Sequence, residues 1–158
     1  MKKYLFISAS ITLLADGLTK IICQRFLADH VIDSSPLIKL YCTRNSGIAF
    51  GWFHSLPWIG LIVAPILVAL GIFFFFRCKT KPFTQIACGM IIGGFFGNWL
   101  ERLLFGSVLD MITFPFLPFF VCNIADIAIC FGMAEVAVSL LFDKKDWVAK
   151  EASHLDNK

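Results

Sequence analysis

The chain has 158 residues, of which 58% are hydrophobic and 16% are charged, and it contains 18 Phe. This composition excludes an ordinary soluble domain, in which about a quarter of the residues are charged. The net charge of +3 arises from lysines and arginines that flank apolar stretches, so it gives no reason to expect a nucleic-acid partner.

Four apolar stretches approach the roughly 20 residues that cross a bilayer as a helix. They lie at residues 4–22, 57–76, 85–105 and 119–142. The rest of the chain is too short and dispersed for a second core, so we expect one integral membrane domain over residues 1–158. The fold class expected is an all-α membrane protein with four transmembrane helices.

The distribution of Lys and Arg predicts the orientation in the membrane. Basic residues precede the first apolar stretch (positions 2 and 3), fill the connection between the second and third (77, 79 and 81) and follow the fourth (144, 145 and 150). The connection between the third and fourth, residues 106–118, contains none. The positive-inside rule then places both termini in the cytoplasm. The basic, apolar N-terminus also resembles a cleavable signal peptide, but Leu13 and Ala15 make a poor cleavage site, which favours a permanent span.

In the first stretch, Ser8, Thr12, Asp16 and Lys20 recur at every fourth residue and therefore share one face of a helix. At about 1.5 Å per residue, Asp16 and Lys20 fall in the outer half of the bilayer. Two interpretations remain open. The pair either neutralises itself at i, i+4, or it braces a polar site.

The connection that follows, residues 23–56, changes character. Residues 37–53 are rich in β-formers and include the turn residues Asn45, Ser46 and Gly47. We expect a small, partly β extracytoplasmic platform between helices 1 and 2.

The third stretch has Gly93 and Gly97 in a GxxxG spacing, which permits close helix contact. Asn98 and Arg102 lie one turn apart and must be satisfied within the protein. Pro115 and Pro118 then disfavour helix and predict an extended stretch.

The carboxylates of Asp110 and Asp126 are expected to lie at the same depth in the membrane. Asp110 follows the third stretch, while Asn123 and Asp126 share one helical face in the first turns of the fourth. Two carboxyls that share a proton are pushed apart in pKa, so that one acts as a base on water and the other donates to a carbonyl. This is the chemistry of an aspartic protease, and it requires no metal or organic cofactor.

Two other functions fit the same residues. A small proton- or ion-coupled transporter would use Asp16, Lys20, Arg102, Asp110 and Asp126 as a relay, although these groups crowd the outer half of the bilayer. In a structural subunit the polar groups would only join helices, which leaves Asp110 without a role.

The six cysteines form no CxxC pair and no metal-ligand spacing with histidine. A disulfide between Cys42 and Cys122 is an open alternative that the spacing does not favour.

Four motifs in order resemble those of the lipoprotein signal peptidases, also called signal peptidase II. They are DGLTK at 16–20, NSGIAF at 45–50, GGFFGNWLERLLFGSVLD at 93–110 and NIAD at 123–126. The resemblance implies a multi-pass aspartic endopeptidase of the bacterial inner membrane, active on the outer side. Its substrate would be a prolipoprotein, cut on the N-terminal side of a diacylglyceryl-modified Cys, and a monomer is expected.

By motif position, Asp110 and Asp126 would be the catalytic pair. The resemblance gives supporting roles to three groups of residues: a frame of Asn98, Arg102 and Asn123, a brace of Asp16 and Lys20, and a platform of Asn45, Gly47 and Ala49. The chain departs from the family pattern at Gly17, Glu101 and Cys122, where Gln, Asp and Phe are more frequent.

Overall fold

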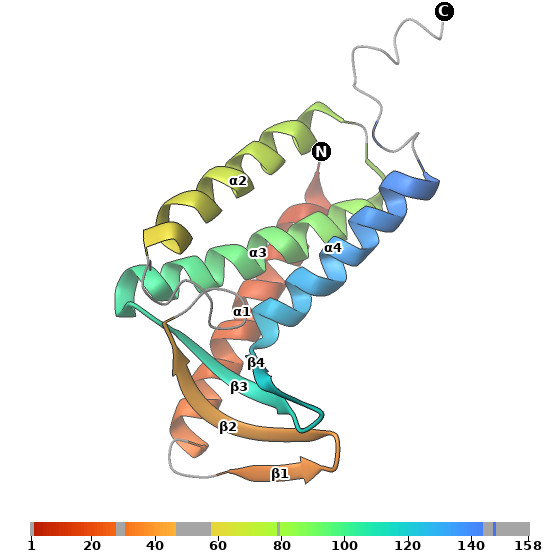
Figure 1. Ribbon diagram of the computed structural model, residues 1–158. Coiled ribbons are helices and arrows are strands. Elements are labelled where there is room, and N and C mark those ends of the chain that lie inside the picture. The colour runs from red at the N-terminus through yellow and green to blue at the C-terminus, as the bar shows by residue number, and fades with distance from the viewer. Residues whose placement is uncertain (1, 28–30, 47–57, 79, 144–146, 148–158) are drawn as a thin grey trace, which may run out of the picture.

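A computed structural model describes residues 2–27, 31–46, 58–78, 80–143 and 147. Within these residues the chain forms four helices and one four-stranded sheet (Figure 1). The helices lie alongside one another, and the sheet lies at one end of them, opposite the end that holds the N-terminus (Figure 1).

The helices are α1 (Lys3–Phe26), α2 (Trp58–Arg77), α3 (Pro82–Phe105) and α4 (Ile124–Phe142). Within the described residues α1, α3 and α4 are long and apolar enough to cross a membrane, and α2 contributes a shorter apolar stretch, Val68–Arg77. Three of the expected spans are thus confirmed by length and composition. The remaining span, expected at residues 57–76, stays a prediction.

The strands are β1 (Ile32–Ser35), β2 (Ile38–Asn45), β3 (Val108–Phe114) and β4 (Leu117–Cys122). They pair antiparallel in the order β1-β2-β3-β4. The expected β platform between helices 1 and 2 is present and supplies half of the sheet, and the other half comes from the connection between α3 and α4. The hairpin of β3 and β4 completes the sheet: β3 pairs with β2, whose backbone groups would otherwise form an unpaired edge.

The expected start of the fourth helix at Phe119 is wrong. Pro115 and Phe116 form the turn between β3 and β4, and the chain stays extended as far as Cys122. Asn123 then has the extended backbone of a helix N-cap. The two prolines did predict an extended stretch, but the strand continues past them.

Helix α3 lies at the centre and contacts the other three helices. Small residues permit the close approach: a Cβ built on Gly93 would lie 2.5 Å from the carbonyl oxygen of Ala9 in α1, and one on Gly94 would lie 2.7 Å from that of Ala125 in α4. The polar face of α1 turns inward as expected. Ser8, Thr12, Asp16 and Lys20 are all buried there.

Candidate active site

Asp110 lies in β3 with 2% of its surface exposed. Its Oδ2 accepts a hydrogen bond of 2.9 Å from the side-chain amide of Asn45, at the end of β2. Its Oδ1 accepts one of 2.7 Å from the amide of Asn123. The antiparallel pairing of β2 with β3 thus brings together groups 65 residues apart.

Asp126 lies in the first turn of α4, where it forms a capping box with Asn123. The backbone N–H of Asp126 donates to the side-chain oxygen of Asn123 at 2.9 Å, and Oδ2 of Asp126 accepts from the backbone N–H of Asn123 at 3.2 Å. Its Oδ1 accepts from the amide of Asn98 at 2.9 Å.

Asn123 connects the two carboxylates. The residue is completely buried, and the amide nitrogen that donates to Asp110 lies 3.2 Å from the side-chain oxygen of Asn98. Asn98 in turn donates to Asp126. The side-chain amides that donate to the two carboxylates, those of Asn45, Asn98 and Asn123, are therefore neutral and do not offset the carboxylate charge.

The pKa of Asp110 is raised from 3.8 to about 6, chiefly by burial and also by the charge of Asp126, which together outweigh the lowering effect of the Asn45 and Asn123 hydrogen bonds and of Lys20. A carboxyl in this range exchanges its proton near neutral pH, as a general acid or base must. Burial, with the charges of Asp126 and Asp110, raises the pKa of Cys122 to about 12. Cys122 therefore stays a neutral thiol and is no nucleophile.

Lys20 gathers the groups behind the pair. Its Nζ lies 2.7 Å from Oδ2 of Asp16, 2.8 Å from Oε2 of Glu101 and 3.0 Å from Oδ1 of Asn98. The other oxygen of Asp16 accepts from the backbone N–H of Ala125, the neighbour of Asp126, at 3.0 Å. Asp16 and Lys20 are thus more than a self-neutralising pair, because they reach both α3 and α4.

Glu101 received no role from the sequence, where it was only a departure from the family pattern. Its Oε1 accepts a hydrogen bond of 3.0 Å from the backbone N–H of Leu109, the residue before Asp110, and lies 3.8 Å from Nη1 of Arg44. The one local feature that could have indicated a role for Glu101 in the site is its position one turn beyond Asn98 on α3. Its contact with β3 arises from the tertiary fold.

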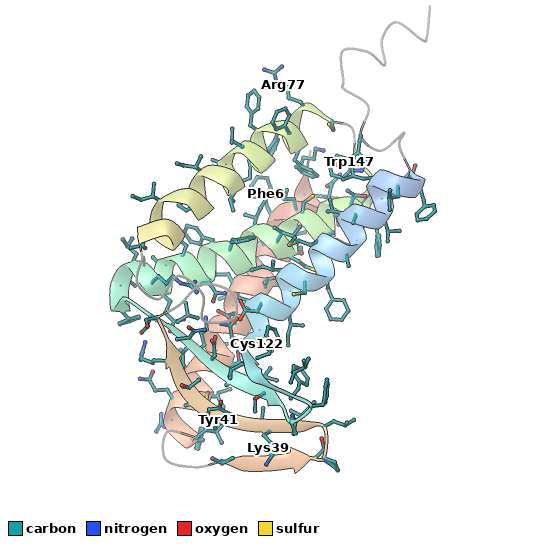
Figure 2. All side chains as sticks on the ribbon, viewed as in Figure 1. Phe6, Lys39, Tyr41, Arg77, Cys122 and Trp147 are labelled. Carbon is teal, nitrogen blue, oxygen red and sulfur yellow. A yellow bond between two sulfur atoms is a disulfide. The ribbon has the colours of Figure 1, made fainter. Side chains whose placement is uncertain are left out.

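Of the remaining expected site residues, the structure describes Arg102 but not Gly47 and Ala49. Arg102 donates from Nη1 to the backbone oxygen of Asn98 at 3.3 Å. Gly47 and Ala49 lie outside the described residues. Figure 2 shows where the site lies: Cys122, which precedes Asn123, is labelled at the junction of the sheet with α4.

A model of the signal peptidase II family matches residues 8–142. The lipoprotein signal peptidase of Bartonella bacilliformis is 34% identical over 97% of this chain and 94% of its own length. That of Acaryochloris marina is 36% identical over 84% and 86%. A solved structure described as a bacterial membrane enzyme superposes with a TM-score of 0.78 at 25% identity, over 92% of each chain.

These comparisons give no support to a transporter. The family match extends from the polar face of α1 to the end of α4 and so includes every described residue of the site. Three of the described helices, α1, α3 and α4, are long and apolar enough to cross a membrane, as expected of a member of this family. The chain belongs to the signal peptidase II family, the lipoprotein signal peptidases.

Proposed function

We propose that this chain is an aspartic endopeptidase that removes the signal peptide from diacylglyceryl-modified prolipoproteins, on the N-terminal side of the lipidated Cys. The observation that carries the proposal is the pair of carboxylates, Asp110 and Asp126, oriented by Asn123. The family relationship supports the substrate class, because its members are named lipoprotein signal peptidases.

In the proposed reaction, one carboxylate of the pair takes a proton from a water molecule while the water oxygen attacks the carbonyl carbon of the scissile peptide. The other carboxyl, protonated, gives its proton to the carbonyl oxygen. The tetrahedral intermediate then collapses: the C–N bond breaks, a proton passes from the first carboxyl to the leaving amine, and one hydroxyl of the intermediate returns its proton to the second carboxylate as the C=O bond re-forms. The carboxyl pair itself supplies every proton transfer.

The remaining polar groups hold this pair. Asn45, Asn98 and Asn123 donate to the carboxylates, and they leave the shared proton on the pair because they are neutral. Asp16 and Lys20 brace the helices behind them, and Arg102 supports Asn98 by donating to its backbone oxygen within α3. We assign Gly47 and Ala49 to the outer platform by their place in the family motif.

The arrangement in the membrane follows the charge distribution. The protein would work as a single domain with four spans in the bacterial inner membrane, with both termini in the cytoplasm and the sheet on the outer side. The substrate enters from the bilayer, because its acyl chains anchor it there. A monomer suffices, since every proposed site residue comes from one chain.

Cleavage of a lipidated prolipoprotein peptide by the purified protein tests this function. We expect cleavage of the lipidated peptide and none of its unlipidated form. Asp110→Asn and Asp126→Asn should each abolish activity. Asp143→Asn, a control at an exposed ion pair with Lys81, should retain it.

A second assay uses globomycin, an inhibitor that the family resemblance implies. The compound should raise the melting temperature of the wild-type protein and block cleavage. Full activity in a folded Asp110→Asn or Asp126→Asn variant would remove the proposed pair, and indifference to globomycin would argue against the substrate class.

A further inference from the structure

A disulfide ties the end of α1 to the strand that pairs with the strand of Asp110. It joins Cys23, in the last turn of α1, to Cys42 in β2, 19 positions further along the chain. The next residue, Thr43, lies opposite Asp110 in the register of β2 with β3. Asn45, whose amide donates to Asp110, follows two positions later. The bond therefore holds β2 beside the point where this strand meets the carboxylate.

The bond also packs against the neighbours of Asp110 in β3. Cys23, Leu109 and Met111 form one buried cluster, each with 5% or less of its surface exposed, and Cys42 packs against it. Leu109 and Met111 precede and follow Asp110, and successive side chains of a strand point to opposite faces. The disulfide and its cluster therefore support the face of β3 that lies behind the carboxylate.

The same bond connects the supports of the two carboxylates. On α1, Lys20 lies one turn before Cys23 and contacts the side chain of Asn98, which donates to Asp126. On β2 lies a donor to the other carboxylate. In the part of the chain that the structure describes, the disulfide is the only covalent cross-link. Without it, β2 would be free to move relative to α1, and one carboxylate relative to the other.

The position of the bond agrees with the proposed orientation in the membrane. Both bonded cysteines belong to the sheet end of the bundle, which is proposed to face the outer side (Figure 1). Cys78, just beyond the opposite end of α2, is a free thiol. Disulfides persist outside the cytoplasm, where glutathione and thioredoxin do not keep thiols reduced. The bond is thus stable on the side where the proposed cleavage takes place.

We propose that the disulfide between Cys23 and Cys42 positions Asp110 for catalysis, so that the enzyme works at its full rate only while this bond is closed. This role rests on the proposed peptidase function, whose carboxylate pair includes Asp110. The bond adds no group to the reaction. It acts through β2 and β3, and its loss should slow the chemical step more than it weakens substrate binding.

A dithiol opens the bond by exchange. One thiolate of the reagent attacks Sγ of Cys42, the half-buried member of the pair, and Cys23 leaves as a thiolate that takes up a proton. The second thiolate of the reagent then displaces Cys42, which is also protonated. The reagent leaves as a disulfide, having given two electrons, and the protein gains two thiols.

Kinetics of the oxidised and the reduced protein test this role. The full chain in detergent is left oxidised or treated with dithiothreitol, and cleavage of the lipidated peptide is followed well below both melting temperatures. We expect reduction to lower kcat about tenfold with little change in KM, and reoxidation to restore it. The double variant Cys23→Ser/Cys42→Ser should have the low kcat from the start and should not respond to dithiothreitol.

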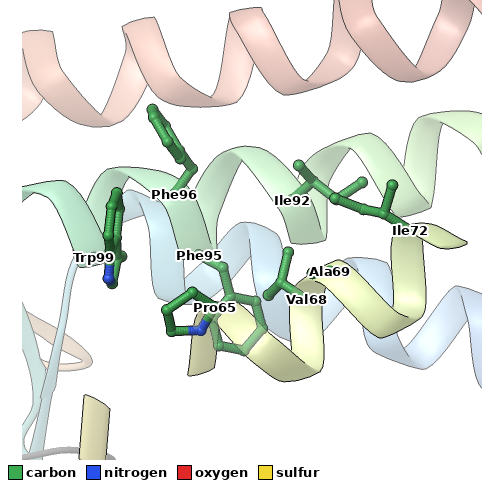
Figure 3. Close-up of a pocket in the computed structure, with 8 residues that line it drawn as sticks. All are labelled: Pro65, Val68, Ala69, Ile72, Ile92, Phe95, Phe96 and Trp99. Atoms are coloured by element: carbon green, nitrogen blue, oxygen red, sulfur yellow. The ribbon is translucent and has the colours of Figure 1, made fainter. Parts of the chain in front are cut away.

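Two controls separate the bond from stability and from packing. Ile92→Ala enlarges an apolar cavity of about 300 Å³ between α2 and α3 (Figure 3) and should lower the melting temperature without lowering kcat. Cys23→Val/Cys42→Ala keeps the buried cluster apolar without a bond and should be as slow as the reduced wild type. Equal kcat in the oxidised and reduced protein would overturn the proposal. So would wild-type kcat in the Val/Ala variant, or a comparable loss of kcat in Ile92→Ala.

A second readout does not depend on cleavage. In the oxidised protein, the melting temperature of Asp110→Asn relative to wild type should increase from pH 4 to pH 7, because burial raises the pKa of Asp110. Reduction should flatten this increase, because a loosened β3 admits water to the carboxyl. If the oxidised wild type cleaved no lipidated peptide, the proposed function would fail and this trend would still decide the role of the bond. An unchanged trend after reduction would overturn it.

Discussion

The side-chain amide of Asn123 donates a hydrogen bond of 2.7 Å to Asp110, while the side-chain oxygen of the same residue caps the helix that carries Asp126. One buried residue therefore fixes the carboxylate on the strand and the carboxylate on the helix at once. The helix cannot begin elsewhere without moving Asp126 relative to Asp110. The N-cap of α4 and the arrangement of the carboxylate pair thus depend on the same residue.

Substitutions of Asn123 separate these two roles. Asn123→Ser keeps an oxygen that caps the helix but loses the donor to Asp110, whereas Asn123→Ala loses both. We expect cleavage to fall at least tenfold in each, and the Ala variant to be less stable than the Ser variant by about 1 kcal/mol. Thermal melts in detergent and a peptide cleavage assay measure the two effects. Wild-type activity in the Ser variant would contradict the role of the amide.

The raised pKa of Asp110 predicts a pH-dependent stability. Its pKa is about 6 in the fold against 3.8 for the ordinary side chain, so the folded state binds more protons in this range and loses stability as the pH rises through it. This penalty, an upper limit of about 3 kcal/mol, is complete above pH 6 and absent below pH 4.

Asp110→Asn removes that penalty. The melting temperature of the variant relative to wild type should therefore increase from pH 4 to pH 7. Asp143→Asn, at an exposed ion pair, serves as the control and should show no such trend. A constant difference across the range would show that Asp110 titrates at its ordinary pKa.

Glu101 links Lys20, behind the carboxylate pair, to the backbone of β3. Glu101→Ala removes the acceptor of the Leu109 N–H and leaves Lys20 with one carboxylate fewer, and loss of one partner of a buried pair costs about 3 kcal/mol. Glu101→Gln keeps an acceptor and should be milder. We expect both to lower kcat more than they raise KM, because they misplace Asp110 and leave the substrate contacts in place. Unchanged kcat in a folded Glu101→Ala variant would refute this positioning.

Close packing against α3 predicts a contrast between glycines. Gly93→Ala places a Cβ against the backbone of Ala9 and should destabilise the protein by about 1–3 kcal/mol. Gly71→Ala meets open space and should be neutral or stabilising, because Ala favours helix. Melting temperatures of the two variants test whether α1 and α3 pack at this distance.

A disulfide joins Cys23, at the end of α1, to Cys42 in β2. The alternative pairing of Cys42 with Cys122 is wrong, since Cys122 is a free, buried thiol. Closing a loop of this length stabilises a fold by about 3 kcal/mol. Cys23→Ser or treatment with a reductant should therefore lower the melting temperature, while Cys130→Ser should not. Equal melting of oxidised and reduced protein would contradict the bond.

Much of the framework could be predicted from sequence because it depends on local periodicity. Apolar runs of helical length located the helices, and the four-residue spacing from Ser8 to Lys20 predicted the buried face of α1. The motifs that include Asp110 and Asp126 led to the correct family. Each of these signals lies within one stretch of chain, where helix geometry alone relates neighbouring residues.

Only the tertiary structure decided how the separate stretches meet. The pairing of β2 with β3 joins residues more than 60 positions apart, so no local pattern shows that Asn45 reaches Asp110. The start of α4 moved from Phe119 to Ile124 because strand pairing holds residues 117–122 extended. The contact of Glu101 with Leu109 likewise depends on the tertiary fold, because it joins a side chain of α3 to the backbone of β3. Sequence determined which polar residues must be buried, and packing between distant elements determined what each of them touches.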